Sequence, residues 1–216
     1  MEKAIKATKT ARYFTSCPPS EKVRQLWFVM HGYGQLADDF LPAFHCLNSP
    51  GHMVIAPEGM HRFYLRGFSG KVGASWMTKV ARESDIADYI TLLDEIFMRE
   101  TAELDISKIK INVLGFSQGA ATACRWATSG NQRIDNPVLW SGIFPPDLPL
   151  TDRLAPVLTP ELFLVIGERD PIVDKSELKE QLARLDNMGK AYRLINFRGT
   201  HAIDQQTLLR LEGLLL

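Results

Sequence analysis

Short, continuous apolar runs recur along the chain and alternate with segments of helical spacing, and this restricts its fold more than any other feature. The runs, rich in β-branched and aromatic residues, lie at 26–31, 53–57, 109–115, 137–142, 161–167 and 191–197. Runs without polar alternation are typical of strands buried on both faces. Helical spacing predicts helices at 36–47, 83–103, 118–128, 174–188 and from 202 to the C-terminus. The alternation predicts an α/β fold with a mostly parallel, doubly wound sheet and helices on both faces.

The length and the loops fit one domain. A chain of 216 residues can form a single core that buries roughly 70% of the unfolded surface, so we predict one domain over 1–216. Residues 8–15 are expected to add an antiparallel edge strand. The Pro-rich segment 143–160 is interpreted as a surface loop, because buried-strand patterns continue on both sides of it. The irregular stretch 58–80 contains several aromatic residues, and loops of this length are often functional.

Composition excludes several classes of partner. Lys+Arg and Asp+Glu each total 25, and the net charge of zero offers no surface for a nucleic acid. No stretch approaches the roughly 18 apolar residues of a membrane span, and the N-terminus has no apolar signal region, so we expect a cytoplasmic protein. Cys17, Cys46 and Cys124 are spaced too widely for a disulfide framework or a metal site. We expect reduced thiols and no metal or other cofactor.

The segment that follows the third predicted strand carries a reactive pattern. Gly115-Phe116-Ser117-Gln118-Gly119 matches G-x-S-x-G, with an apolar strand before it and a helix of small residues after it. In that context the pattern predicts a sharp strand-to-helix turn that exposes the serine hydroxyl. Ser117 is therefore the candidate nucleophile.

A serine needs a base, and the base needs a third group to orient it. Asp170 follows the strand 161–167 and His201 follows the strand 191–197, in the order Ser, Asp, His of α/β-hydrolases. We predict a triad of Ser117, His201 and Asp170, with Glu168 and Asp174 as alternative acids.

The remaining site predictions concern backbone donors and aromatic side chains. The turn after the first buried strand, His31 to Gly34, is expected to present the Tyr33 N–H, which with the Gln118 N–H forms an oxyanion hole. His31 itself is interpreted as a structural histidine of this turn. Trp76, Phe68 and Tyr64 are candidate substrate-binding residues.

The motifs HGYG (31–34), GFSQGAA (115–121), GERDPIV (167–173) and GTHAI (199–203), with Ser75-Trp76, resemble the phospholipase/carboxylesterase family of α/β-hydrolases, which includes acyl-protein thioesterases. The resemblance extends from about residue 25 to the end. It implies a small esterase without a large lid, and it matches the predicted triad and oxyanion donors position by position. Carboxylic esters, thioesters and lysophospholipids all stay open as substrates. Family members commonly have an aromatic residue and an acid after the tryptophan, whereas this chain has Met77-Thr78, so deacylation of lipidated proteins is not implied.

Two alternatives belong to other classes. Gly32 and Gly34 satisfy a dinucleotide-binding pattern, and Glu58 stands where a ribose-binding acid is expected. That interpretation leaves the triad unexplained, and Pro42 interrupts the helix that it requires. The other alternative is a hydrolase-like binding domain without activity.

Overall fold

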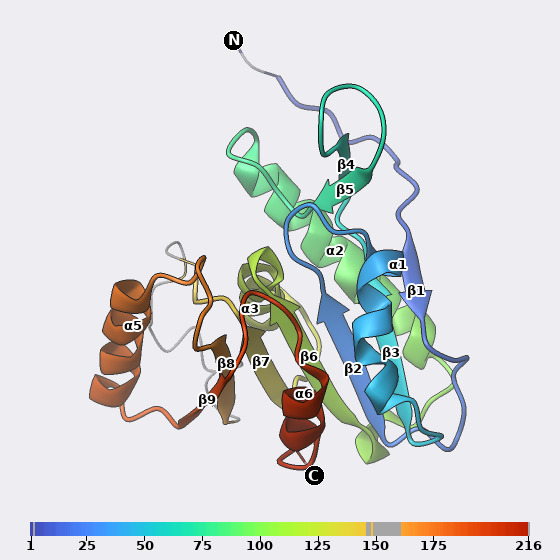
Figure 1. The fold of residues 1–216 in the computed structure, drawn as a ribbon. Helices are drawn as coiled ribbons and strands as arrows, with labels where there is room; N and C mark the ends of the chain where they lie inside the picture. Colours follow the sequence, from blue (N-terminus) through green and yellow to red (C-terminus); the bar gives the residue numbers. More distant parts are fainter. Residues whose placement is uncertain (2, 146–147, 149–160, 216) are drawn as a thin grey trace.

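The computed structural model describes residues 1, 3–145, 148 and 161–215 (Figure 1). Most of the Pro-rich segment 143–160, predicted as a surface loop, lies outside them. The described strands build a seven-stranded sheet in the order β1-β3-β2-β6-β7-β8-β9. All neighbouring pairs are parallel except β1, which is antiparallel to β3. The strands are β1 (Tyr13–Thr15), β2 (Gln25–Met30), β3 (His52–Pro57), β6 (Lys110–Phe116), β7 (Asn136–Trp140), β8 (Leu162–Gly167) and β9 (Tyr192–Phe197).

Helices cover both faces of the sheet, as a doubly wound fold requires (Figure 1). One face packs against α2 (Arg82–Thr101), α3 (Gln118–Ser129) and α5 (Lys175–Asn187). The other packs against α1 (Ala37–Phe40), the 3-10 helix η1 (Leu41–Leu47) and α6 (Gln205–Glu212). Alternate residues of β2 enter opposite cores, Phe28 on the first face and Trp27 on the second. This two-sided burial is why the strands are continuously apolar.

Two segments differ from the sequence prediction. The expected helix 36–47 is a single α-helical turn followed by η1, because Pro42 at the start of η1 has no N–H to continue α-helical bonding. The stretch 58–80 contains an antiparallel hairpin of β4 (His61–Tyr64) and β5 (Val72–Ser75). Its connecting segment turns at Gly67 and Gly70, where φ is +58° and +91°, conformations that glycine adopts without a steric penalty. A further 3-10 helix, η2 (Ile106–Lys108), precedes β6.

The parallel arrangement brings the carboxyl ends of β2, β6, β7, β8 and β9 to one edge of the sheet, where ligands of such folds bind. In the described part of the chain, no helix combines the length and the apolar character that crossing a membrane requires.

Candidate active site

Ser117 stands on the turn between β6 and α3. Its φ is +54° and its ψ is −117°, a conformation that costs a non-glycine residue about 1–3 kcal/mol and persists only where packing imposes it. Packing does so here, because a Cβ on Gly115 would lie 2.2 Å from the Gly119 carbonyl oxygen, and one on Gly119 would lie 2.2 Å from that of Met30. The two glycines let α3 approach β6 and β2 closely enough to hold this turn.

Asp170 and His201 form a hydrogen-bonded pair. His201 Nδ1 lies 3.0 Å from Oδ1 and 2.9 Å from Oδ2 of Asp170. The Asp170 side chain is 1% exposed and the His201 side chain 15%. Burial opposes ionisation of the carboxylate, but its hydrogen bonds, first among them the one from the Ile172 N–H, outweigh burial and lower the pKa of Asp170 below its ordinary value. An ionised carboxylate that accepts from Nδ1 leaves Nε2 of the imidazole free to take a proton.

Trp140 connects the turn of Ser117 with the loop of His201. Its carbonyl accepts a hydrogen bond from the Ser117 N–H at 2.9 Å, and its indole donates to the Ala202 carbonyl at 2.9 Å. The ring of Phe116 lies 4.8 Å from the imidazole of His201. Among the described residues, no hydrogen bond joins the Ser117 hydroxyl to His201, which is common in serine hydrolases before substrate binds.

The backbone N–H groups on either side of Tyr33, one of the two predicted oxyanion donors, are already bonded. The Gly34 N–H donates to the Ala74 carbonyl at 2.8 Å, and the Gly32 N–H donates to a side-chain amide oxygen at 2.8 Å. The N–H groups of Tyr33 and Gln118 have no acceptor within the described parts of the chain. Gln118 also begins α3, where the helix dipole favours negative charge.

The Gln118 side chain has a role that the sequence analysis did not predict. Its Oε1 accepts from the Trp76 N–H at 3.2 Å, and its Nε2 donates to the Ser75 hydroxyl at 3.0 Å and to the Met77 carbonyl at 3.2 Å. These bonds fasten the end of the β4–β5 hairpin to the turn that carries Ser117. No local pattern signals them, because the partners are more than 40 residues away in sequence.

His31 and Trp76 form a buried layer behind the site. The Gly59 N–H donates to Nε2 of His31 at 2.9 Å, so Nδ1 carries the proton and donates to the Gly32 carbonyl at 2.8 Å. Burial lowers the pKa of His31, which favours the neutral ring of a structural histidine. The Trp76 indole stacks on that ring at 5.0 Å and donates to the His31 carbonyl.

The three candidate substrate-binding residues are placed differently from one another. Trp76 is 1% exposed and packs in the core, so it presents no free face to a ligand. Tyr64, at the end of β4, is 49% exposed, and Phe68, in the segment between β4 and β5, is 98% exposed. Tyr33 was predicted only as a backbone donor, but the residue is also 63% exposed. Its ring packs on that of Phe63, with 5.1 Å between the ring centroids.

The residues of the dinucleotide-binding alternative are occupied elsewhere. Glu58 is 1% exposed, and its carboxylate accepts from Arg12 at 3.0 Å and from Arg62 at 2.6 Å. The N–H groups of Gly32 and Gly34 are both bonded, as described above. The Glu58 carboxylate and the two glycine N–H groups on which that alternative depends are therefore already bonded within the protein.

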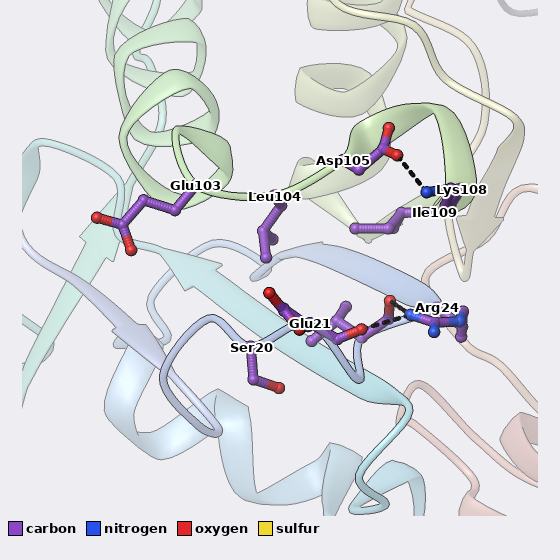
Figure 2. Close-up of a pocket in the computed structure, with 9 residues that line it drawn as sticks. Ser20, Glu21, Arg24, Glu103, Leu104, Asp105, Lys108 and Ile109 are labelled. Atoms are coloured by element: carbon purple, nitrogen blue, oxygen red, sulfur yellow. Dashed lines mark hydrogen bonds and ion pairs between the residues drawn. The ribbon is translucent and has the colours of Figure 1, made fainter.

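A cavity of about 370 Å³ lies at the opposite, amino-terminal ends of β2 and β6 (Figure 2). Two of its charged lining residues pair with each other: Lys108 lies 2.8 Å from Asp105 and holds the pKa of that carboxyl at about 2. The Arg24 guanidinium donates to the carbonyls of Glu21 and Val23. We assign no chemistry to this cavity. Within the described ranges, His, Cys, Asp and Glu side chains form no group of three that is arranged to hold a metal.

A mostly parallel sheet with a serine on the strained turn after β6, and a carboxylate–histidine pair at the ends of β8 and β9, defines the α/β-hydrolase class. The chain belongs to the phospholipase/carboxylesterase family, whose model matches residues 12–214. This confirms the resemblance found in the sequence and makes the protein an ester hydrolase.

Solved structures of similar fold include acyl-protein thioesterase 2 of Zea mays and a carboxylesterase of Bacillus cereus. The first has a TM-score of 0.69 and 18% identity, with 95% of this chain and 98% of that chain covered. The second has a TM-score of 0.66 and 16% identity, with 95% and 93% covered. A phospholipase/carboxylesterase of Dyadobacter fermentans has a TM-score of 0.65 and 18% identity, with 97% and 98% covered. At these identities the likeness establishes the fold.

Proposed function

We propose that the protein is a serine esterase that hydrolyses carboxylic esters through an acyl-enzyme, with a triad of Ser117, His201 and Asp170. The observation that carries the proposal is the bond from His201 Nδ1 to the buried carboxylate of Asp170, at the same sheet edge as the strained turn of Ser117. The family to which the chain belongs supports the same reaction class.

The mechanism follows from where protons and charge are held. Nε2 of His201 takes the Ser117 hydroxyl proton as the oxygen attacks the ester carbonyl, and Asp170 stabilises the imidazolium that forms. The tetrahedral oxyanion accepts from the N–H groups of Tyr33 and Gln118. Collapse breaks the bond to the leaving alkoxide, which receives the proton from His201. In the second half, His201 takes a proton from a water molecule, whose oxygen attacks the acyl-enzyme carbonyl. When the second tetrahedral intermediate collapses, the bond to Ser117 breaks, His201 returns the proton to the Ser117 oxygen, and the acid is released.

We propose contacts with the substrate on the basis of which aromatic side chains are exposed. Tyr64 and Phe68 of the hairpin are exposed aromatic side chains that we assign to contacts with the acyl or alcohol part of the substrate. Trp76 is instead assigned a structural role, because its ring stacks on His31 in the turn that carries Tyr33. Thioesters and lysophospholipids pass through the same tetrahedral chemistry, so both belong with carboxylic esters in the substrate panel.

The decisive experiment compares wild type with Ser117→Ala on chromogenic acyl esters of graded chain length, with a thioester and a lysophospholipid included. We expect kcat/KM to fall by about 10³-fold or more in the variant, since triad members act as one unit. Equal rates in the two proteins would contradict the mechanism. An inactive wild type across the panel would favour a hydrolase-like binding domain.

We also propose a cytoplasmic location and a small-molecule partner rather than a nucleic acid. Three free thiols, at Cys17, Cys46 and Cys124, support a reducing compartment. The balance of 25 basic and 25 acidic residues supports the absence of a nucleic-acid surface.

A further inference from the structure

Ser141 has a strained backbone at the edge of the site. It follows β7 with a φ of +50°, and its N–H donates to the Val165 carbonyl of β8 at 2.8 Å. Among the described residues, only Ser117 and Ala81 share a positive φ without being glycine. Ala81 is exposed and precedes α2, whereas Ser141 is 2% exposed. Strained residues that are buried at functional sites are often part of the mechanism.

The side chain of Ser141 is unusual as well. Its hydroxyl is fully buried and meets no acceptor at hydrogen-bonding geometry in the described parts of the chain. A buried hydroxyl without a partner is rare and asks for an explanation. The hydroxyl nevertheless lies near enough to the Asp170 carboxylate to contribute, after the larger effects of burial and the Ile172 N–H, to the pKa of that group, which it lowers.

The Asp170 carboxylate has room for such a donor on one oxygen only. Oδ1 accepts from the Ile172 N–H at 2.9 Å, from the Val173 N–H at 3.3 Å and from His201 Nδ1 at 3.0 Å. Oδ2 has the His201 Nδ1 at 2.9 Å as its one donor among the described residues. A carboxylate that is 1% exposed has no bulk water to fill the vacant acceptor position, so a second protein donor is expected there.

We propose that Ser141 is a positioning residue whose hydroxyl, after a small rotation, donates to Oδ2 of Asp170. Ser141 follows β7, which pairs with β8, and Asp170 stands in the turn directly after β8. The bond holds the carboxylate plane against the imidazole and shares its negative charge. Ser141 does not touch the substrate, and no proton is transferred to or from it. This inference rests on the proposed triad.

The test compares Ser141→Ala and Ser141→Gly, which remove the same hydroxyl but treat the backbone differently. Without the hydroxyl the carboxylate rotates more freely, so we expect kcat to fall about tenfold in both variants with KM unchanged. The carboxylate charge is also less shared and draws more strongly on the imidazolium. We therefore expect the acid limb of the kcat/KM profile to move to higher pH by about half a unit in both variants.

The charged groups around the pair stay constant in these variants. Glu168 and Arg169 lie in the same turn as Asp170, and the Lys175 ammonium of α5 donates to the Glu168 carbonyl. Asp204 caps α6 by accepting from the Thr207 N–H. A shift of the acid limb therefore reports the lost hydroxyl.

Thermal stability distinguishes the effect of backbone strain at position 141 from the effect of losing the hydroxyl. Glycine relieves the left-handed strain and alanine does not, so Ser141→Gly is expected to melt above Ser141→Ala while the two share one pH profile. Ala81→Gly relieves similar backbone strain away from the site, and its kcat/KM should show the same pH profile as that of the wild type.

Three outcomes would overturn the proposal: a wild-type profile and kcat in both Ser141 variants, an effect in Ser141→Ala that Ser141→Gly lacks, or the same limb shift in Ala81→Gly. Ser117→Ala, assayed alongside, distinguishes these from a failure of the triad itself, because in that case Ser117→Ala would retain activity.

Discussion

At the residue scale, single side chains hold the candidate site together across long sequence separations. Trp140 is fully buried and bonds both the turn of Ser117 and the loop of His201. Trp27 is equally buried in the same core, but its indole N–H has no acceptor among the described residues. The two tryptophans therefore form a matched pair, alike in burial and different in hydrogen bonding.

Trp140→Phe should lower activity more than Trp27→Phe. The first removes the bond to the Ala202 carbonyl, which contributes about 0.5–1.5 kcal/mol as a typical hydrogen bond does, and so releases the loop that carries the neighbouring His201. We expect its kcat/KM to fall at least about tenfold, corresponding to roughly 1.4 kcal/mol. Trp27→Phe loses packing but no hydrogen bond, so its kcat/KM should stay within about twofold of wild type. Steady-state kinetics of both variants checks this, and equal losses would refute the bridging role of Trp140.

At the element scale, the site depends on how closely α3 approaches the sheet. Gly115 and Gly119 stand at the contacts of α3 with β6 and β2, where a Cβ would meet backbone atoms at 2.2 Å. Backbone cannot move aside as the end of a flexible side chain can, so an added methyl group must push the helix away from the strands. The turn of Ser117 would move with it.

Gly119→Ala is expected to destabilise the protein by about 3 kcal/mol or more, as overpacking of backbone does, and to lower kcat/KM. Gly51→Ala is the control, since the nearest atom to a Cβ there is a side-chain oxygen at 3.8 Å. We expect Gly51→Ala to change stability by less than about 0.5 kcal/mol. Urea unfolding of both variants measures the difference, and similar midpoints would show that the close approach does not constrain α3.

At the scale of the whole molecule, one sheet separates two hydrophobic cores. Trp76 and Trp126 lie in the core under α2, α3 and α5, and Trp27 and Trp140 lie in the core under α1, η1 and α6. The two cores share the same strands, because alternate residues of each strand enter opposite sides. Loss of the sheet removes one wall of each core at once.

We therefore expect one cooperative unfolding transition, as for a single domain. Tryptophan fluorescence samples both cores, and far-UV circular dichroism follows the backbone, so their thermal or urea transitions should coincide. Two separated transitions would show that the chain does not unfold as one domain.

The sequence by itself determined the alternation of strands and helices, the family motifs and the order of Ser117, Asp170 and His201 along the chain. These properties are local, because burial on two faces imposes a continuous apolar run and a helix face imposes its own period. The carboxyl ends of parallel strands meet at one edge, so the order of the residues was enough to predict that they converge.

Tertiary contacts alone decided which side chains are buried and which bonds hold the site together, and they separated Asp170 from the two alternative acids. The sequence favoured Asp170 and left Glu168 and Asp174 as alternatives. In the structure Asp174 caps α5 and Glu168 is exposed, whereas Asp170 pairs with His201. The side-chain bonds of Gln118, the bridge of Trp140 and the burial of Trp76 join residues far apart in the chain. Such contacts depend on the packing of α3 and the hairpin against the finished sheet, and no local period or propensity records them.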